Sequence, residues 1–179
     1  PGFDFALEKK GILKYYKSQK RGEEEVQLAE KAKGMGLDVE VLTKQQAQAL
    51  EPETELDILG AVHYKCDAHL YPNKLIPQLI TYLQKAGVAI QKNSPVKNFI
   101  VQKDLVKRVV TEMADYEADM IVMASGSWLA QIARMAHIKI PLMPGKGYSF
   151  TYDHPQKKLN IPDILCEARV AITPMNGYM

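Results

Sequence analysis

The sequence contains few of the features that mark disulfide-rich, zinc-binding or membrane-spanning proteins. Only two of its 179 residues are cysteines, Cys66 and Cys166, and they form no Cys-x-x-Cys pair. This argues against a disulfide framework or a zinc site and suits a reducing compartment. No apolar run approaches the roughly 20 residues that span a bilayer. We therefore expect a cytoplasmic protein, and peripheral association with the cytoplasmic side of a membrane stays open.

The sequence also has no large excess of positive or negative charge. The 23 lysines and arginines are interleaved with 21 acidic residues, which gives a net charge of +2. A nucleic-acid-binding protein usually gathers its basic residues into a stripe, and this sequence has none. The four histidines lie too far apart for a His-x-x-x-His metal site. Ser125 and Ser127 lack the G-x-S-x-G elbow of hydrolases. We expect no nucleic-acid partner and no bound metal.

Apolar periodicity predicts alternating helices and strands. Helices are expected at about 21–35, after Thr43, at about 72–86, and from Ser125 to about 135. In the first of these, Leu28, Ala32 and Met35 share a face. Thr43-Lys-Gln-Gln46 is a capping-box pattern at the start of the second helix, and Gly11 is expected to have the positive φ of a hairpin turn. Strands are expected at 12–16 (in a hairpin with 5–7), 39–41, 60–64, 88–91, 96–101, 106–110, 116–118, 120–124, 141–152, 164–166 and 170–173. The mixture predicts an α/β or α+β protein.

The stretch from 88 to 128 carries the clearest chemical signal. Met120–Ala124 is a continuous apolar run, as expected for a strand covered on both faces, and it leads through Ser125-Gly-Ser127 into a helix. Ligands of open α/β sheets bind beyond the carboxyl ends of strands, and backbone N–H groups at helix starts favour phosphates. Gly126 would allow close approach of the backbone. An ordinary turn produces the same pattern, so the residues alone leave both interpretations open.

The order of motifs adds to this signal. Pro95-Val96 opens a three-stranded meander that ends in Ala124-Ser-Gly-Ser-Trp128. The flanking motifs are Asp67-Ala-His-Leu-Tyr-Pro72, Pro144-Gly-Lys-Gly-Tyr-Ser149 and Val170-Ala-Ile-Thr-Pro174. This arrangement resembles the D-amino-acid oxidase family of FAD-dependent oxidoreductases, and within it the D-amino-acid dehydrogenase branch.

The resemblance implies FAD as the cofactor and assigns five residues to it by position. Val96 would contact the adenine through its backbone. Ala124, Ser125 and Gly126 would lie near the dinucleotide, and Trp128 would pack beside it. As an alternative, Trp128 is an ordinary core residue.

The resemblance also places two residues at the substrate. Lys146 and Tyr148 would border the substrate cavity near the isoalloxazine, with Tyr148 offering its hydroxyl to a carboxylate. A surface or core role for Tyr148 and a solvated or ion-paired role for Lys146 are the alternatives. Met175 stands where several family members carry an arginine that binds the substrate carboxylate. The sequence does not identify a catalytic acid or base.

The implied architecture is one interrupted domain around a second one. Residues 3–65 and 137–179 would form a substrate domain with a mixed sheet, and residues 66–136 would form part of the FAD-binding domain. The G-x-G-x-x-G turn that cradles the pyrophosphate is absent from the sequence. Because the chain starts at Pro1 and ends in a turn sequence at residues 176–179, we expect an internal fragment. By itself this fragment should neither retain FAD nor be active.

For the intact protein the resemblance implies oxidation of the C–N bond of a D-amino acid or related amine, by hydride transfer to the flavin. A first alternative is an FAD-dependent 2-hydroxy acid or glycerol-phosphate dehydrogenase. A second, of another class, is a non-catalytic ligand-binding module. The electron acceptor, oxygen or a quinone, and the oligomeric state stay open.

Overall fold

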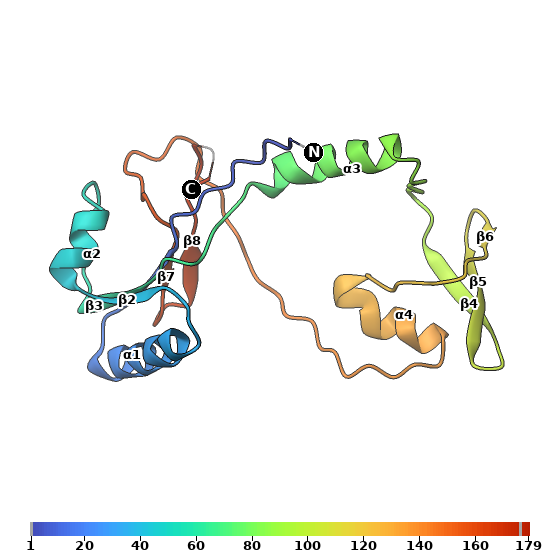
Figure 1. Cartoon of the computed structure of the whole chain (residues 1–179), viewed down its shortest axis with the longest axis horizontal. Coiled ribbons are helices and arrows are strands. Elements are labelled where there is room, and N and C mark those ends of the chain that lie inside the picture. The colour runs from blue at the N-terminus through green and yellow to red at the C-terminus, as the bar shows by residue number, and fades with distance from the viewer. Residues whose placement is uncertain (1, 176) are drawn as a thin grey trace. The chain divides into compact units, whose positions relative to one another are not determined.

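The computed structural model describes residues 2–175 and 177–179. Pro1 and Asn176, on which the expectation of an internal fragment partly rests, lie outside the described residues. The chain divides into two compact units (Figure 1). Unit 1 comprises residues 1–86 and 150–179, and unit 2 comprises residues 87–149.

Unit 1 is built on a five-stranded mixed sheet. Its strands are β1 (Ile12–Tyr16), β2 (Val39–Thr43), β3 (Gly60–Tyr64), β7 (Asp163–Leu165) and β8 (Val170–Ile172), in the order β2-β3-β1-β7-β8. The pair β1 and β7 is parallel, with Leu13 opposite Asp163, and the other three pairs are antiparallel. The predicted α/β class with a mixed sheet is therefore confirmed.

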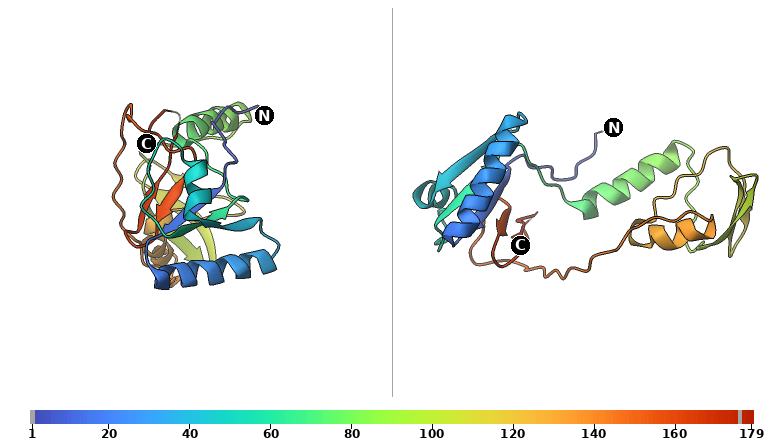
Figure 2. Two further views of the ribbon diagram at one scale, coloured as in Figure 1. Left: turned by 90° about the vertical axis from the view of Figure 1, so that its left-hand side faces the viewer. Right: turned by 90° about the horizontal axis from the view of Figure 1, so that it is seen from below.

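Two helices cover opposite faces of this sheet. Helix α1 (Gln19–Gly34) lies along the sheet (Figure 2). Its Ala29 forms a small buried cluster with Val39 and Val62 of the sheet. Helix α2 (Lys44–Leu50) belongs to the larger cluster on the other face, where Leu13 and Tyr15 are buried. The side chains of a strand alternate between faces, so the same strands serve both clusters.

Local signals explain where these helices begin. The Ser18 side chain accepts a hydrogen bond from the Arg21 N–H, and Thr43 forms the expected capping box with Gln46. The predicted apolar face of α1 is right for Ala32, which packs against the small cluster, but wrong for Leu28 and Met35, which are 46% and 81% exposed. The buried face instead carries Gly22, Glu25 and Ala29.

The predicted hairpin between residues 5 and 16 is also wrong. Glu8 forms its bridge with His69, far along the chain, and the Gly11 N–H donates to the Asp67 carbonyl at 3.1 Å. Gly11 does have the predicted positive φ, +77°, and a Cβ there would lie 2.5 Å from the Tyr64 carbonyl oxygen. The chain thus turns at Gly11, but its two arms pair with other segments.

Helix α3 (Pro72–Lys85) lies at the end of the first segment of unit 1 and follows the predicted bounds closely. None of its residues is buried. It contacts the start of the chain, where the rings of Phe3 and Tyr82 meet edge to face at 5.6 Å and the Asp4 N–H donates to the Gln78 side chain at 3.1 Å.

Unit 2 is an antiparallel meander followed by a short helical segment. Strands β4 (Val96–Gln102), β5 (Leu105–Thr111) and β6 (Asp115–Tyr116) pair in sequence order, as predicted. The turn between β4 and β5 has φ of +50° at Lys103 and +61° at Asp104, as in a type I′ hairpin. A 3₁₀ turn, η1 (Gly126–Trp128), and helix α4 (Leu129–Met135) follow.

Three predicted strands do not form. Residues 88–91, 120–124 and most of 141–152 have no ladder partner among the described residues. A strand needs a neighbour for its backbone groups, and without one the apolar side chains stay uncovered: Met120 is 81% and Val122 79% exposed. Only the end of the last segment pairs, because the Tyr152 N–H donates to the Met179 carbonyl.

Candidate functional site

All seven residues predicted to contact cofactor or substrate lie in unit 2. Val96 is the first residue of β4 and is half-buried opposite Thr111 of β5. Just before it, the Ser94 hydroxyl donates to the Thr111 hydroxyl at 3.0 Å, which ties the strand entrance to β5.

The turn from Ala124 to Trp128 is open and carries one unsatisfied polar group. Gly126 has a φ of +53°, and no atom lies within 4 Å of the position of an added Cβ. The Ser125 hydroxyl oxygen is buried without a hydrogen-bond partner among the described residues. Trp128 donates its backbone N–H to the Ser125 carbonyl at 3.1 Å, and its side chain is 67% exposed. The turn therefore combines an approachable backbone at Gly126 and an exposed indole with a hydroxyl that is buried and unpaired.

Lys146 and Tyr148 lie in the exposed segment where a strand was predicted. The Lys146 ammonium stands 5.2 Å from the centre of the Tyr148 ring, in a cation–π contact. The two side chains are thus neighbours, as expected for positions two apart in an extended chain. Tyr148 is 82% exposed, and neither residue lines the pockets described below.

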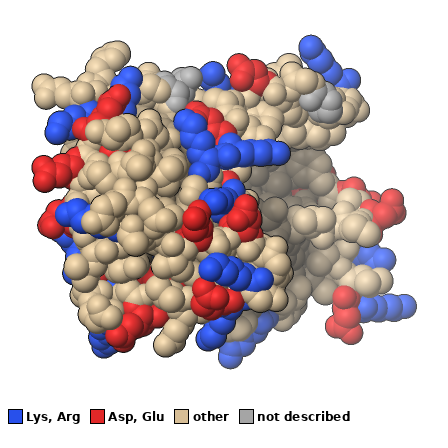
Figure 3. All heavy atoms as spheres, turned by 60° about the vertical axis from the view of Figure 1, so that its left-hand side comes forward, with Lys and Arg blue, Asp and Glu red and all other residues tan. Residues whose placement is uncertain are grey.

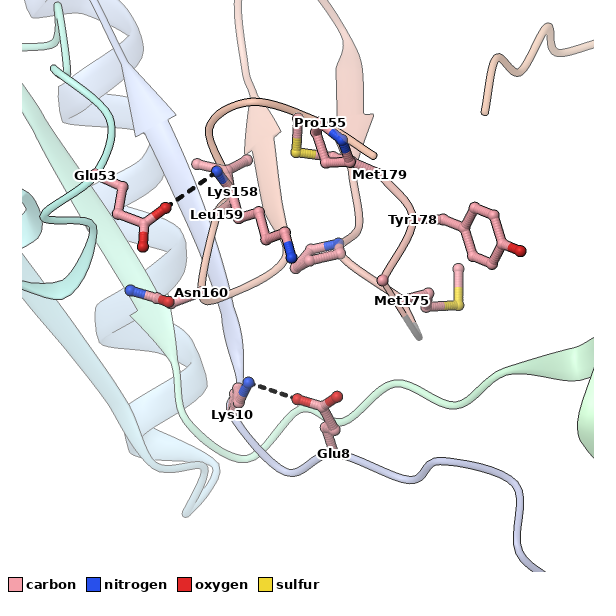
Figure 4. Close-up of a pocket in the computed structure, with 12 residues that line it drawn as sticks. Glu8, Lys10, Glu53, Pro155, Lys158, Leu159, Asn160, Met175, Tyr178 and Met179 are labelled. Atoms are coloured by element: carbon pink, nitrogen blue, oxygen red, sulfur yellow. Dashed lines mark hydrogen bonds and ion pairs between the residues drawn. The ribbon is translucent and has the colours of Figure 1, made fainter. Parts of the chain in front are cut away.

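A charged pocket of about 210 Å³ lies in unit 1 (Figure 4). Figure 4 shows Glu8 and Lys10 on one side, joined by an ion pair of 2.5 Å that lowers the pKa of Glu8. On the other side the backbone N–H of Lys158 donates to Glu53 at 3.4 Å. Met175 also lines this pocket. Of the four charged side chains of this pocket, Glu8 and Lys10 pair with each other, and Glu53 accepts a backbone N–H.

A second pocket, of about 470 Å³ and mainly apolar, opens on the α2 face of the same sheet. Tyr15 and Asp163 line it, and each is only 2% exposed. Burial raises the pKa of Asp163 to about 7, and the nearby Glu51 carboxylate adds to the shift. Burial also raises the pKa of Tyr15, with Asp163 and Glu51 contributing.

Glu51 is fully buried beside these two residues. Its carboxylate accepts the backbone N–H groups of Asn160 at 2.7 Å and Ile161 at 2.9 Å, and so holds the loop before β7. Burial raises the pKa of Glu51, and these two hydrogen bonds oppose the shift. Sequence analysis did not find Tyr15, Glu51 or Asp163, because neither a motif nor a spacing relates them. The pairing of β1 with β7 brings Tyr15 and Asp163 together, and the hydrogen bonds to Asn160 and Ile161 place Glu51 beside them.

On the face shown in Figure 3, basic and acidic side chains are interspersed. Within residues 2–175 and 177–179, no three His, Cys, Asp or Glu side chains are placed to hold a metal ion. No helix in the same part of the chain is long and apolar enough to cross a membrane.

Comparison with known proteins identifies the family. The sequence profile of the FAD dependent oxidoreductase family matches residues 1–179, so the chain belongs to this family. It is 25% identical over 174 residues to a D-amino acid dehydrogenase of Helicobacter pylori. This alignment covers 97% of this chain and 41% of the relative. It is also 28% identical over 142 residues to 4-methylaminobutanoate oxidase (formaldehyde-forming) of Paenarthrobacter nicotinovorans. This second alignment covers 79% of this chain and 17% of the relative.

Solved structures confirm the fold. Glycine oxidase from Geobacillus kaustophilus superposes with a TM-score of 0.87 at 22% identity, over 98% of this chain and 47% of that one. The chain thus spans less than half the length of the proteins it matches. The predicted family and its FAD dependence are confirmed at the level of the family.

Proposed function

We propose that the intact protein oxidises the C–N bond of a D-amino acid or a related amine with FAD. The observation that carries the proposal is the D-amino acid dehydrogenase relative, which aligns with 97% of this chain. The methylaminobutanoate oxidase relative extends the substrate class to secondary amines. FAD would supply the hydride acceptor, and loss of hydride and a proton leaves an imine that water hydrolyses.

The proposed cofactor contacts lie in the turn of unit 2. The open space at Gly126 and the unsatisfied Ser125 hydroxyl fit a polar group of the dinucleotide that approaches this turn. The exposed indole of Trp128 offers the dinucleotide an apolar surface. Ala124, at the start of the turn, is also proposed to lie near the dinucleotide. Val96 is proposed to contact the adenine through its backbone.

The proposed substrate contacts are Tyr148 and Lys146. A hydroxyl and an ammonium on neighbouring side chains suit a carboxylate, and the cation–π contact holds the ammonium beside the ring. We also propose that residues 3–65 and 137–179 form the substrate domain and that residues 66–136 belong to the FAD-binding domain.

Turnover by the intact protein tests the reaction. D-amino acids, their L-enantiomers, N-methylated amino acids and sn-glycerol 3-phosphate are compared with an artificial electron acceptor. Release of the 2-oxo acid and of ammonia or methylamine from an amine supports the proposal. Oxidation of glycerol phosphate alone would replace it with the hydroxyl-oxidising alternative.

Gly126→Val tests the cofactor turn. A valine fits poorly at positive φ and blocks the approach of a ligand, so the dissociation constant of FAD should rise by about tenfold or more, or about 1.4 kcal/mol. Gly87→Val is the control, because Gly87 also has a positive φ with no atom within 4 Å of an added Cβ, but it lies outside the turn. Equal FAD affinity in both variants would contradict the assignment.

A further inference from the structure

The apolar pocket of unit 1 has the composition of a ligand site. Its volume of about 470 Å³ lies within the range of small-molecule pockets. Its walls include the side chains of Leu56, Ile58 and Leu159, each 6–8% exposed, and those of Leu165 and Ile172. All these residues belong to unit 1, so a single compact unit forms the pocket.

Two residues that line this pocket each bury a polar atom that has no partner among the described residues. These atoms are the Tyr15 hydroxyl oxygen and one carboxyl oxygen, Oδ1, of Asp163. The two side chains lie on the same face of the adjacent strands β1 and β7, because Leu13 and Tyr15 pair with Asp163 and Leu165. Buried polar groups in folded proteins are nearly always hydrogen-bonded, so two such atoms in the lining of one pocket point to a ligand.

Three charged groups at the rim, in contrast, already have partners. Lys17 forms an ion pair with Asp57 at 2.6 Å. Glu167 accepts the backbone N–H groups of Lys17 at 3.0 Å and of Ser18 at 3.1 Å. No ion pair to Asp163 occurs among the described residues. The unmet hydrogen bonding is therefore confined to the interior.

The carboxyl and hydroxyl groups of this pocket suit a ligand that is positively charged and donates hydrogen bonds. A carboxyl group without a basic partner, flanked by a second carboxylate at Glu51, is stabilised in its charged form by a positive charge. A hydroxyl beside it can accept a further N–H, and the surrounding leucine and isoleucine side chains suit a hydrocarbon body. We propose that this pocket binds a small organic ammonium ion with an apolar body, which donates to Asp163 Oδ1 and to the Tyr15 hydroxyl.

Binding of 2-phenylethylammonium to the intact protein tests this site, with 2-phenylethanol as the uncharged probe of similar shape. Calorimetry should show ammonium binding that is about tenfold tighter or more than binding of the alcohol. In Asp163→Asn, which keeps the shape of the side chain, this preference should disappear. Tyr15→Phe should weaken ammonium binding by a smaller factor.

Asp57→Asn is the matched control, because it removes a carboxylate at the rim of the same pocket, where its side chain is 91% exposed. It should leave the preference for the ammonium unchanged. The proposal is overturned if the ammonium shows no saturable binding, if the preference persists in Asp163→Asn, or if a crystal structure of the intact protein shows a side chain filling the pocket. Turnover is not the readout, so failure of the proposed oxidation leaves this result interpretable.

Discussion

Unit 1 and unit 2 differ in what their apolar residues contact. In unit 1 apolar side chains fill clusters on both faces of the sheet, and Leu13, Ala61 and Val62 are fully buried. In unit 2, all of which the structure describes, the buried apolar residues are Phe99, Ala133 and Ala136. Unit 1 is thus held together by its own core, whereas unit 2 has little core beyond the contact between its sheet and α4.

Several strongly exposed apolar side chains of unit 2 lie in or near the segments proposed to bind ligands. Val122, Trp128, Met143 and Tyr148 are 67–92% exposed. Large exposed apolar surfaces usually mark contacts with a ligand or a partner. The difference between the units therefore supports a division of roles, in which unit 1 provides stability and unit 2 presents surface. The predictions below test it.

The largest effect is expected at the buried ion pair of unit 1. The Glu25 side chain is fully buried and pairs with Lys14 and, at 2.9 Å, with Arg21. Glu25→Ala leaves Lys14 without its partner, and we expect a loss of about 3–5 kcal/mol in unfolding free energy. Glu117 of unit 2 also pairs with an arginine at 2.9 Å, but its side chain is 70% exposed. Glu117→Ala should leave the denaturation midpoint nearly unchanged, and equal losses would contradict the comparison.

Shortening an apolar side chain should also destabilise the protein more in unit 1 than in unit 2. Leu13 is fully buried in the centre of the sheet, and Leu13→Ala should cost about 2–5 kcal/mol in urea denaturation. Val122 in unit 2 is 79% exposed, so Val122→Ala should cost less than about 0.5 kcal/mol. A large loss for Val122→Ala would show that its segment packs against a partner in solution.

The sequence predicts features that depend on neighbouring residues. The capping box at Thr43 and the positive φ of Gly11 are confirmed, because side chains and backbone within a few residues decide them. Contacts between distant segments were missed. The parallel pairing of β1 with β7 joins residues about 150 positions apart, and it alone creates the site of Tyr15 and Asp163.

The wrong predictions have the same origin. The burial of Glu25 depends on Lys14 of another element, so periodicity favoured Leu28 instead. The run 120–124 is apolar enough for a buried strand but has no neighbour among the described residues. The proposed cofactor and substrate residues stay predictions, since they depend on contacts beyond either unit.

The pH dependence of stability should report on Asp163. Its pKa is about 7 in the folded chain and about 3.8 in the unfolded chain, so the folded state binds more protons between these values. Stability contributed by this group therefore decreases from about pH 4 to pH 7 and is constant above it, with a total change of at most about 4 kcal/mol. Denaturation of the chain and of Asp163→Asn across this range isolates the effect. A difference between the two that does not vary with pH would contradict the assigned pKa.

The smallest effects are expected at Tyr148 and Lys146, because both are exposed and neither supports a core. In the intact enzyme Tyr148→Phe keeps the ring beside Lys146 and removes only the hydroxyl. If that hydroxyl binds the substrate carboxylate in a buried site, kcat/KM should fall by about 5- to 150-fold, or about 1–3 kcal/mol. Lys146→Met should cost less and should mainly reduce the dependence of kcat/KM on salt, since an exposed ammonium attracts anions through a screened field. The unfolding midpoint should not change in either variant. Unchanged kcat/KM in both would remove this segment from the substrate site and leave unit 2 with a cofactor role alone.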